Sequence, residues 1–440
     1  MEHFMKLQRE DIVSSFVVFI VALPLSLGVA LASGASTEAG LITAVLGGVL
    51  CGLLSGAPLV VAGPAAGLTV FVYQLIQQHG IKGLALVTIL AGVLQILMGA
   101  LKLGRFFSYV PRSVLEGMLS AIGFIIACSQ LHVLLGAGVP TSVSKSLLTL
   151  PESLQNVLWP IVFCGALAVA IQVSWNYLPK KFRWIPGALP AVIIATLLSL
   201  AWDMPRVKIA DFFATIGETV SSHTIAPFLQ NWWGLIVSAL GLAIVASAET
   251  LLTAIALDGI TTKRDGRPSK ANLDRELLAH GTTNAACGFV GGLPLTGVIV
   301  RSAVNVNSGA RTRLSTILHG LWIAVFVIFA PHVLQQIPLT ALAAVLVVTG
   351  FKLLNIHEFR KLLAHSKPQA ALWAVTFFGI LFSDLLTGLG IGMSFYLLQK
   401  LYRPIPRVVP NKVLQPKVKE EMVLGIVSEN RMPEREQALR

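Results

Sequence analysis

Two charged side chains stand within apolar stretches of the chain. Arg301 lies in the stretch 297–304, and Glu249 lies near the middle of the stretch 245–254. A charge inside a membrane segment costs roughly 3 kcal/mol or more and by default marks a functional site. We interpret Arg301 as a fixed positive charge that attracts an anion or balances a carboxylate. The alternative is that its long side chain reaches the cytoplasmic surface beside the basic loop that follows.

Glu249 and Thr253 are four residues apart and therefore share one face of a helix. A carboxylate and a hydroxyl could coordinate Na⁺, a cation with the preference of hard ions for oxygen ligands. Alternatively, Glu249 could carry a coupled proton, because burial favours the neutral form of a carboxyl group. The third possibility is a static ion pair between Glu249 and Arg301. Apart from Na⁺ or H⁺ as a coupling ion, we expect no cofactor and no bound metal.

Two apolar segments are unusually short, and each follows a Gly/Pro-containing stretch, at 62–64 and 291–297. The start of a helix presents unpaired N–H groups and the positive end of its dipole. Two such starts meeting at the bilayer midplane would form an anion site. We expect its residues to come from both segments: Ala65, Ala66, Gly67, Val300, Arg301 and Ser302. The alternative for the small residues is that they only allow helices to pack closely.

The composition requires lipid as the solvent for most of the surface. Hydrophobic residues make up 55% of the 440 residues and charged residues 12%, against about 25% charged in soluble domains. Apolar runs without period-two alternation predict an all-α polytopic membrane protein rather than a barrel. The net charge of +12 comes from short basic clusters between these runs, so we expect no nucleic-acid partner. The four cysteines stand singly, which is typical of buried core thiols.

Fourteen helical segments follow from the apolar runs. We place them at 11–32, 38–54, 63–77, 83–101, 113–135, 157–174, 187–202, 233–256, 274–291, 297–308, 313–330, 337–350, 369–387 and 388–402. With the N-terminus in the cytoplasm, the even loops carry most of the basic residues: Lys102, Arg105, Arg112, Lys180, Lys181, Arg183, Lys263, Arg264, Arg267, Lys270, Arg311, Arg313, Lys352, Arg360, Lys361 and Lys367. The positive-inside rule therefore predicts that both termini are cytoplasmic.

The short segments are the third and the tenth, which are equivalent positions if the chain contains two repeats of seven. An odd number of spans per repeat makes the second repeat inverted, and interrupted segments at matching positions indicate a transporter binding site.

Three other acidic residues, Glu116, Glu276 and Asp384, stand at segment ends, where we expect solvation at the interface. The tail, 403–440, is too short for an independent domain.

Several motifs resemble the signature of the SulP anion permeases. The first is the stretch 22–30, followed by Gly40, Leu41 and the run 61–66. Further matches are the stretches 276–284 and 291–297, then 300–305 and 309–312. The similarity covers nearly the whole membrane region, and the motifs are specific in combination.

The resemblance implies a fourteen-helix, seven-plus-seven inverted-repeat fold with half-helices at segments 3 and 10. It implies a core domain (segments 1–4 and 8–11) that moves against a gate domain (segments 5–7 and 12–14) like an elevator, within a transmembrane domain of residues 1–402. Family substrates include bicarbonate, sulfate, chloride and dicarboxylates. Glu249 and Thr253 match an Asp and a Thr of the cation site in Na⁺-coupled relatives, and Arg301 matches an Arg of animal members. The tail 403–440 is expected to be cytoplasmic and to contain no STAS domain.

The sequence therefore predicts a secondary active transporter in the inner membrane. Its substrate would be a small inorganic anion, bicarbonate or sulfate, moved by symport with a cation or by exchange, and a homodimer is possible. One alternative is a nucleobase–cation symporter on the same fold, but such proteins use a carboxylate where this chain has Arg301. Another is a membrane scaffold or motor-like protein that does not transport. We expect no enzyme activity, because no catalytic constellation is present.

Overall fold

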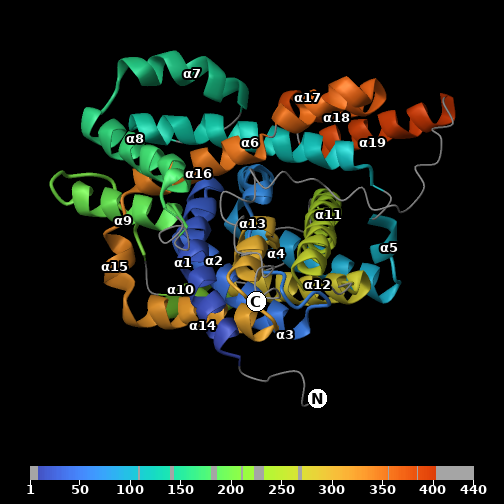
Figure 1. Cartoon of the computed structure of the whole chain (residues 1–440), viewed down its shortest axis with the longest axis horizontal. Coiled ribbons are helices and arrows are strands. Elements are labelled where there is room, and N and C mark those ends of the chain that lie inside the picture. Colours follow the sequence, from blue (N-terminus) through green and yellow to red (C-terminus); the bar gives the residue numbers. More distant parts are fainter. Residues whose placement is uncertain are drawn as a thin grey trace, which may run out of the picture.

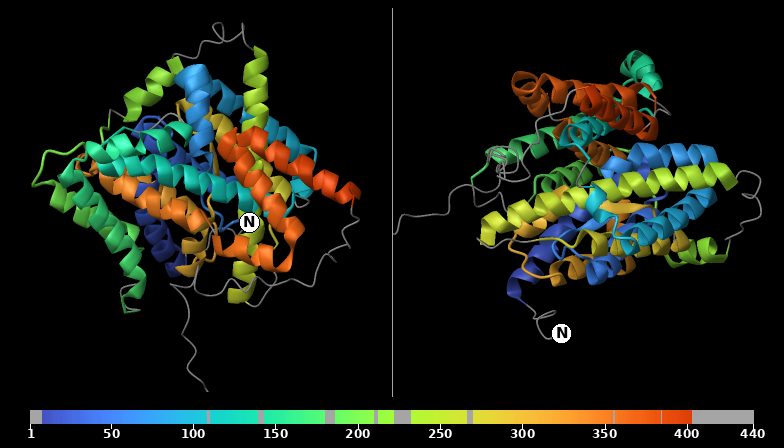
Figure 2. Two further views of the ribbon diagram at one scale, coloured as in Figure 1. Left: turned by 90° about the horizontal axis from the view of Figure 1, so that it is seen from above. Right: turned by 90° about the vertical axis from the view of Figure 1, so that its right-hand side faces the viewer.

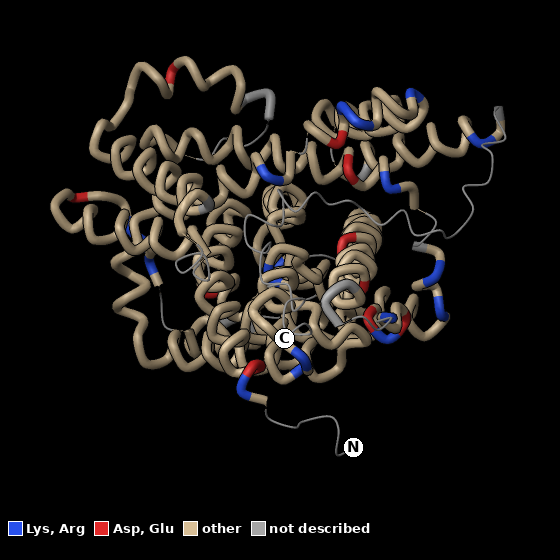
Figure 3. Tube along the Cα trace, viewed as in Figure 1, with Lys and Arg blue, Asp and Glu red and all other residues tan. Residues whose placement is uncertain are grey.

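The computed structural model describes residues 8–107, 110–138, 143–179, 186–209, 212–221, 232–265, 270–354, 356–383 and 385–402. The predicted tail 403–440, Asp384 and the loop residues Lys180, Lys181, Arg183 and Arg267 lie outside this part of the chain. The described part is helical almost throughout, with one pair of three-residue strands. Its helices run in several directions (Figure 1), and long stretches of them carry no charged residue (Figure 3).

The first half of the chain contains the predicted segments 1–7. Its elements are α1 (Arg9–Ala32), α2 (Thr37–Leu46), the π-helix η1 (Gly47–Cys51), α3 (Gly52–Leu54), β1 (Ala62–Pro64), the 3₁₀ turn η2 (Ala66–Leu68), α4 (Thr69–Ala100), α5 (Gly104–Phe107), α6 (Arg112–Leu135), α7 (Val143–Gln155), α8 (Trp159–Ser174), η3 (Trp175–Tyr177) and α9 (Ala188–Ser199). Within α4, Gly80 has φ 71° and interrupts the helix, which separates predicted segments 3 and 4.

The second half contains the predicted segments 8–14. Its elements are α10 (Phe212–Ser221), α11 (Trp232–Asp265), α12 (Leu273–Val290), β2 (Leu295–Gly297), α13 (Ile299–Asn307), α14 (Leu314–Phe329), α15 (Pro331–Gln335), α16 (Leu339–Leu353), α17 (Ile356–His365), α18 (Lys367–Phe382) and α19 (Leu385–Tyr402). Each of the fourteen predicted segments falls on helix, but the boundary between the last two lies near residue 383 rather than 387. The amphipathic helices α7, α10 and α17 were not predicted.

Six helical stretches of the described chain are long and apolar enough to cross a bilayer: Arg9–Ala32, Thr37–Leu54, Ala66–Ala100, Arg112–Leu135, Trp232–Thr262 and Leu339–His365. A seventh candidate is bent by 119° between Ser146–Gln155 and Trp159–Ser174. Several buried hydroxyls inside these helices donate to the carbonyl one turn earlier, as Ser26 does to Ala22 at 2.7 Å and Thr88 does to Leu84 at 2.7 Å, which satisfies these polar groups within their own helix. The chain is therefore a helical, multi-pass membrane protein.

The helices form two layers. In Figure 1, α6, α8, α16, α18 and α19 lie above α1, α2, α4 and α11–α14, and the right-hand view of Figure 2 shows the same separation. In the upper layer α6 packs along α16 and α18, whereas in the lower layer α4 packs along α12 and α11. Buried apolar residues of α6, α18 and α19 meet those of α4 and α11 in one core, and a second core joins α1 and α14 to α8, α9 and α16.

Glycines allow the closest helix crossings. A Cβ at Gly48 would lie 2.5 Å from Cα of Gly320, and one at Gly92 would lie 2.6 Å from the carbonyl oxygen of Gly281. Another crossing brings Gly123 of α6 against the backbone of α16. In lipid such contacts between backbones replace the hydrophobic effect as the source of helix association. The lower layer is thus held together at backbone distance around the two short segments.

Candidate functional site

A two-stranded antiparallel ribbon joins the two short segments that the sequence singled out. Strand β1 pairs with β2 in the register Ala62 with Gly297, Gly63 with Thr296 and Pro64 with Leu295. The amide of Val298 extends the pairing by donating to the carbonyl of Val61 at 2.9 Å. The ribbon therefore holds the start of η2 and the start of α13 on opposite strands of one small structure.

The predicted anion-site residues occupy the first turns of these two helices. Ala65 and Gly67 are buried and Ala66 is half-buried around the start of η2, which leads into α4. In α13 the amides of Ile299, Val300 and Arg301 form the first turn, which has no carbonyl one turn earlier inside the helix. Both starts therefore present N–H groups and the positive end of a helix dipole, as the sequence predicted.

Arg301 is buried at the ribbon. Only 1% of its surface is exposed, so the alternative in which it reaches the cytoplasmic surface is wrong. Its Nη2 donates to the carbonyl of Pro64 at 3.3 Å, and Nη1 lies so close to Gly63 that a Cβ there would overlap it. Within the described chain, Nε and Nη1 have no hydrogen-bond partner. A buried guanidinium with so few partners is costly, and an anion would satisfy it.

Glu249 projects from α11 towards the start of η2. A Cβ at Gly67 would overlap its Oε1 and would lie 2.9 Å from its Oε2. Oε2 is shielded from solvent and has no hydrogen-bond partner among the described residues, and the side chain of Thr296 lies beside the carboxylate. The carboxylate thus lies near the positive end of the half-helix that begins at η2, where the sequence predicted that an anion binds.

No ion pair joins Glu249 to Arg301. The described ion pairs within 4.0 Å are those of Arg112, His280 and Lys361 with glutamates, and none involves Arg301. The interpretation of the two charges as a static pair is therefore wrong. The two charges are therefore separate: Arg301 lies in the first turn of α13 next to the ribbon, and Glu249 reaches the start of η2 from α11.

Three further predicted site residues differ in their surroundings. Thr253 is buried one turn after Glu249, while Val300, in the first turn of α13, is 44% exposed. The hydroxyl of Ser302 donates to the carbonyl of Val298 at 2.8 Å and accepts from the amide of Val61 at 2.9 Å. Ser302 therefore fastens α13 to the strand next to it.

Two threonines at this location were missed in the sequence. The hydroxyl of Thr69, in the first turn of α4, is buried without a hydrogen-bond partner in the described chain, and the buried Thr296, on β2, lies beside the Glu249 carboxylate. Most buried polar side chains are satisfied, so their concentration here indicates a ligand site. Their position directly beside the interrupted segments is the signal that could have identified them.

The prediction that Glu276 is solvated at the membrane interface is wrong. Its side chain is fully buried, and its Oε2 accepts from the hydroxyl of Ser55 at 2.7 Å and from the amides of Gly56 and Ala57 at 2.8 and 2.9 Å. The prediction failed because the partners are about 220 residues distant in sequence. Glu116 is partly exposed and pairs with Arg112 at 2.6 Å, as a residue near an interface can.

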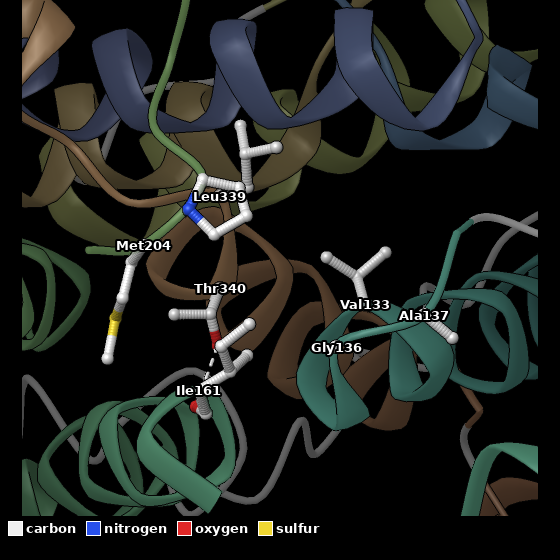
Figure 4. Close-up of a pocket in the computed structure, with 8 residues that line it drawn as sticks. Val133, Gly136, Ala137, Ile161, Met204, Leu339 and Thr340 are labelled. Carbon is white, nitrogen blue, oxygen red and sulfur yellow. Dashed lines mark hydrogen bonds between the residues drawn. The ribbon is translucent and has the colours of Figure 1, made fainter. Parts of the chain in front are cut away.

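A pocket elsewhere in the molecule lies between α6, α8 and α16 (Figure 4). Apolar residues dominate its lining, including Val133, Ile161, Met204 and Leu339. The Thr340 hydroxyl in its wall donates to the carbonyl of Ile161 at 3.3 Å. Because no charged side chain lines it, this pocket offers nothing to hold an anion.

Known proteins are similar to this one over most of the chain. The model of the sulfate permease family matches residues 9–376. The bicarbonate transporter BicA of a Picosynechococcus species is 30% identical over 411 residues, which cover 89% of this chain and 69% of BicA. These matches give no support to the nucleobase symporter or to the scaffold as alternatives.

Solved structures share the fold. The transmembrane domain of a cyanobacterial bicarbonate transporter BicA superposes with a TM-score of 0.75 and 26% identity, covering 88% of this chain and 97% of that domain. The murine anion transporter Slc26a9 in its inward-facing state gives a TM-score of 0.77 at 18% identity, covering 90% of this chain and 69% of that one. With a family match over most of its length, the chain belongs to the sulfate permease family.

Proposed function

We propose that this protein is a secondary active transporter that carries a small inorganic anion, bicarbonate or sulfate, across the inner membrane. The observation that carries the proposal is the buried Arg301 guanidinium at the start of a half-helix, where two of its nitrogens have no hydrogen-bond partner among the described residues. Membership of the sulfate permease family supports an anion as the substrate. The likeness to BicA supports bicarbonate, and the name of the family supports sulfate.

The anion binds between the two half-helix starts in this proposal. Backbone amides near Ala66 and Val300 donate to its oxygens, and Arg301 supplies the positive charge. Ala65 and Gly67 leave room for the anion beside the backbone, and Ser302 holds α13 in place through Val61. Such a site reads the size and charge of the anion more than its shape.

Glu249 provides the coupling to a cation. Its carboxylate faces the start of η2, so it competes with the substrate anion for the same positive helix end until H⁺ or Na⁺ neutralises it. The oxygen atoms of Thr69, Thr253 and Thr296 suit Na⁺, whereas the lack of a partner for Oε2 suits a proton. Either ion would link its own binding to that of the anion, which is the requirement for symport.

Packing between equivalent segments supports fourteen spans in two inverted repeats. Segment 3 meets segment 10 at the ribbon, segment 2 meets 11 (η1 with α14) as 9 meets 4 (α12 with α4), and 5 meets 12 (α6 with α16). Exchanging each segment for the one seven positions away leaves these contacts unchanged. The glycine contacts follow the same rule, since Gly48 meets Gly320 and Gly281 meets Gly92.

The two layers supply a mechanism of transport. In our proposal α1–α4 and α11–α14 form the core domain, which carries the ribbon and its charges, and α6, α8, α9, α16, α18 and α19 form the gate domain. The core slides past the gate like an elevator and exposes the site to each side in turn. Both termini, with the tail 403–440, lie in the cytoplasm, and the protein functions as a homodimer if the gate domains associate.

Reconstitution into liposomes tests the function. We expect uptake of labelled bicarbonate or sulfate that responds to a Na⁺ or pH gradient, and no uptake of labelled uracil. Protein-free liposomes and liposomes with the Arg301→Ala variant serve as controls. Uptake of uracil in preference to both anions, or no uptake of any anion by folded protein, would contradict the proposal.

Replacement of Glu249 by glutamine tests the coupling. The variant keeps the shape of the side chain but loses the charge, so gradient-driven accumulation should fall to background while exchange of labelled for unlabelled anion continues. Thr253→Val should weaken the response to Na⁺ only if Na⁺ is the coupling ion. Both are measured as uptake with and without each gradient, and an unaltered Na⁺ and pH response in both variants would place the coupling elsewhere.

A further inference from the structure

A second group of buried polar side chains lies away from the ribbon, where α3 meets α12. Cys51, Glu276 and His280 are each at most 2% exposed, and one potential ligand atom from each lies within 4.8 Å of the others. The first residue comes from the end of the π-helix η1 and the other two from one face of α12, four residues apart. A π-helical turn inside a helix often accompanies a functional site, because it changes the direction of the side chains.

One nitrogen of His280 faces more acceptors than it can serve. Its Nδ1 lies 3.5 Å from Sγ of Cys51, 3.4 Å from Oε1 of Glu276 and 3.1 Å from the carbonyl oxygen of Glu276. A single ring nitrogen carries at most one hydrogen. Oε1 has no hydrogen-bond partner within the described chain although its side chain is fully buried. The protein therefore leaves a negative oxygen and a sulfur converging on one point.

We infer that Cys51, Glu276 and His280 bind a divalent transition-metal ion, Zn²⁺ by the type of its ligands. In tetrahedral coordination with ordinary Zn–S, Zn–N and Zn–O bonds, a sulfur and a nitrogen are about 3.5 Å apart and a nitrogen and an oxygen about 3.4 Å apart. The two ligand pairs measured from Nδ1 have these separations. Thiolate, imidazole and carboxylate are also the ligands that zinc prefers.

Charge balance favours the same ion. A Cys51 thiolate and a Glu276 carboxylate together carry two negative charges, which one divalent cation neutralises; a neutral site is the form that tolerates burial. The other oxygen of Glu276 is already held by Ser55, Gly56 and Ala57, so the carboxylate is oriented with Oε1 towards the sulfur and the imidazole. This support around the ligand is the kind that raises metal affinity.

The site is close to the surface of the molecule. Leu53 and Leu54, which follow Cys51 within one turn, are 47% and 37% exposed, so the ligands lie within one helical turn of the molecular surface. Arg313 donates to the carbonyl of Leu53 and Arg275 donates to the carbonyl of Leu54, and neither arginine is one of the three proposed ligands. The metal would tie α3 to α12 at the end of the lower layer, and this role is independent of the anion site.

Metal binding to the purified full-length protein tests the inference. After dialysis against Zn²⁺ and removal of the excess, we expect one zinc per chain, and with Co²⁺ we expect the visible and near-ultraviolet absorption of tetrahedral cobalt bound to a thiolate. Cys51→Ser and His280→Asn should each weaken Zn²⁺ binding roughly 100-fold or more, because even residues behind the ligands contribute 10- to 100-fold. Zn²⁺ should also raise the melting temperature of the parent but not of these variants.

Cys164→Ser is the matched control, because Cys164 is an equally buried thiol that instead donates to the carbonyl of Ala195. It should keep the zinc, the cobalt spectrum and the melting shift. Two results would overturn the site: folded parent protein without thiolate-to-cobalt absorption, or equal zinc content in the parent and in Cys51→Ser. The cobalt spectrum needs no variant, so the test stands even if one of the substitutions prevents folding.

Discussion

Replacing Arg301 by alanine is expected to weaken anion binding by roughly 10- to 150-fold and to reduce uptake to near background. A hydrogen bond to a charged group contributes about 1.5–3 kcal/mol, which corresponds to this range of dissociation constants. Within the described part of the chain the guanidinium has a single hydrogen-bond partner, the carbonyl of Pro64, so its removal breaks one hydrogen bond there. Because the lost group is a buried charge with two unpartnered nitrogens, the variant should be at least as stable as the parent.

Binding is measured by scintillation proximity with labelled anion on purified protein, and stability by thermal melting. Arg301→Lys should retain part of the affinity, because it keeps the charge but loses the planar set of donors. Arg112→Ala is the control, since the Arg112 side chain is 68% exposed and pairs with Glu116 on the same helix. Full binding and uptake by Arg301→Ala, with normal melting, would refute the role of this residue.

Replacing Gly67 by valine is expected to abolish anion binding while the protein still folds. Any Cβ at this position overlaps Oε1 of Glu249, so the carboxylate must move and the branched side chain then fills the space at the start of η2. The backbone itself can accept a side chain, because Gly67 does not have the positive φ that demands glycine. Only anion binding should be lost, because overpacking against a neighbour that can move lowers the free energy of unfolding by about 1–3 kcal/mol.

The same binding and melting measurements, together with a double variant, separate the two effects. Glu249→Ala should restore the melting temperature of Gly67→Val, because it removes the overlapping carboxylate, but should not restore binding. Gly390→Val is the control, since no atom lies within 4 Å of a Cβ at that position in α19. If Gly67→Val binds the anion as tightly as the parent, the anion site must be sought away from η2.

The sequence predicted the parts of the site that depend on local signals. Gly/Pro-containing stretches identified both short segments, and the apolar surroundings of Arg301 predicted the burial that the structure shows. The pairing of residues 62–64 with 295–297 could not be predicted, because three-residue strands have no recognisable pattern and their partners are more than 200 residues apart. The sequence also could not predict that Glu249 and Arg301 are separate, because this depends on how α11 packs against the ribbon.

Residues with partners distant in sequence account for the remaining failures. Glu276 stands in the first turn of α12 beside other charged residues, which is typical of a residue at the membrane interface. In the structure it is buried and accepts hydrogen bonds from Ser55 and two backbone amides. The contact between Cys51 and His280 joins residues 229 apart in sequence, so their proximity could not be predicted either. The helix α17 has the charge pattern of a loop, and its amphipathic period alone distinguishes it.

The separate charges of Arg301 and Glu249, next to the ribbon, have an electrical consequence. If Arg301 and an ionised Glu249 travel with the same domain, the empty carrier moves no net charge through the membrane, and its return step is insensitive to the membrane potential. Bicarbonate together with Na⁺ or H⁺ adds no net charge either, so a one-to-one cycle is electroneutral. Neutralising Glu249 leaves one positive charge on the moving domain, whose full passage through a potential of 100 mV changes its energy by about 2.3 kcal/mol. The second charge thus decides whether the resting potential of the cell drives this carrier or leaves it unaffected.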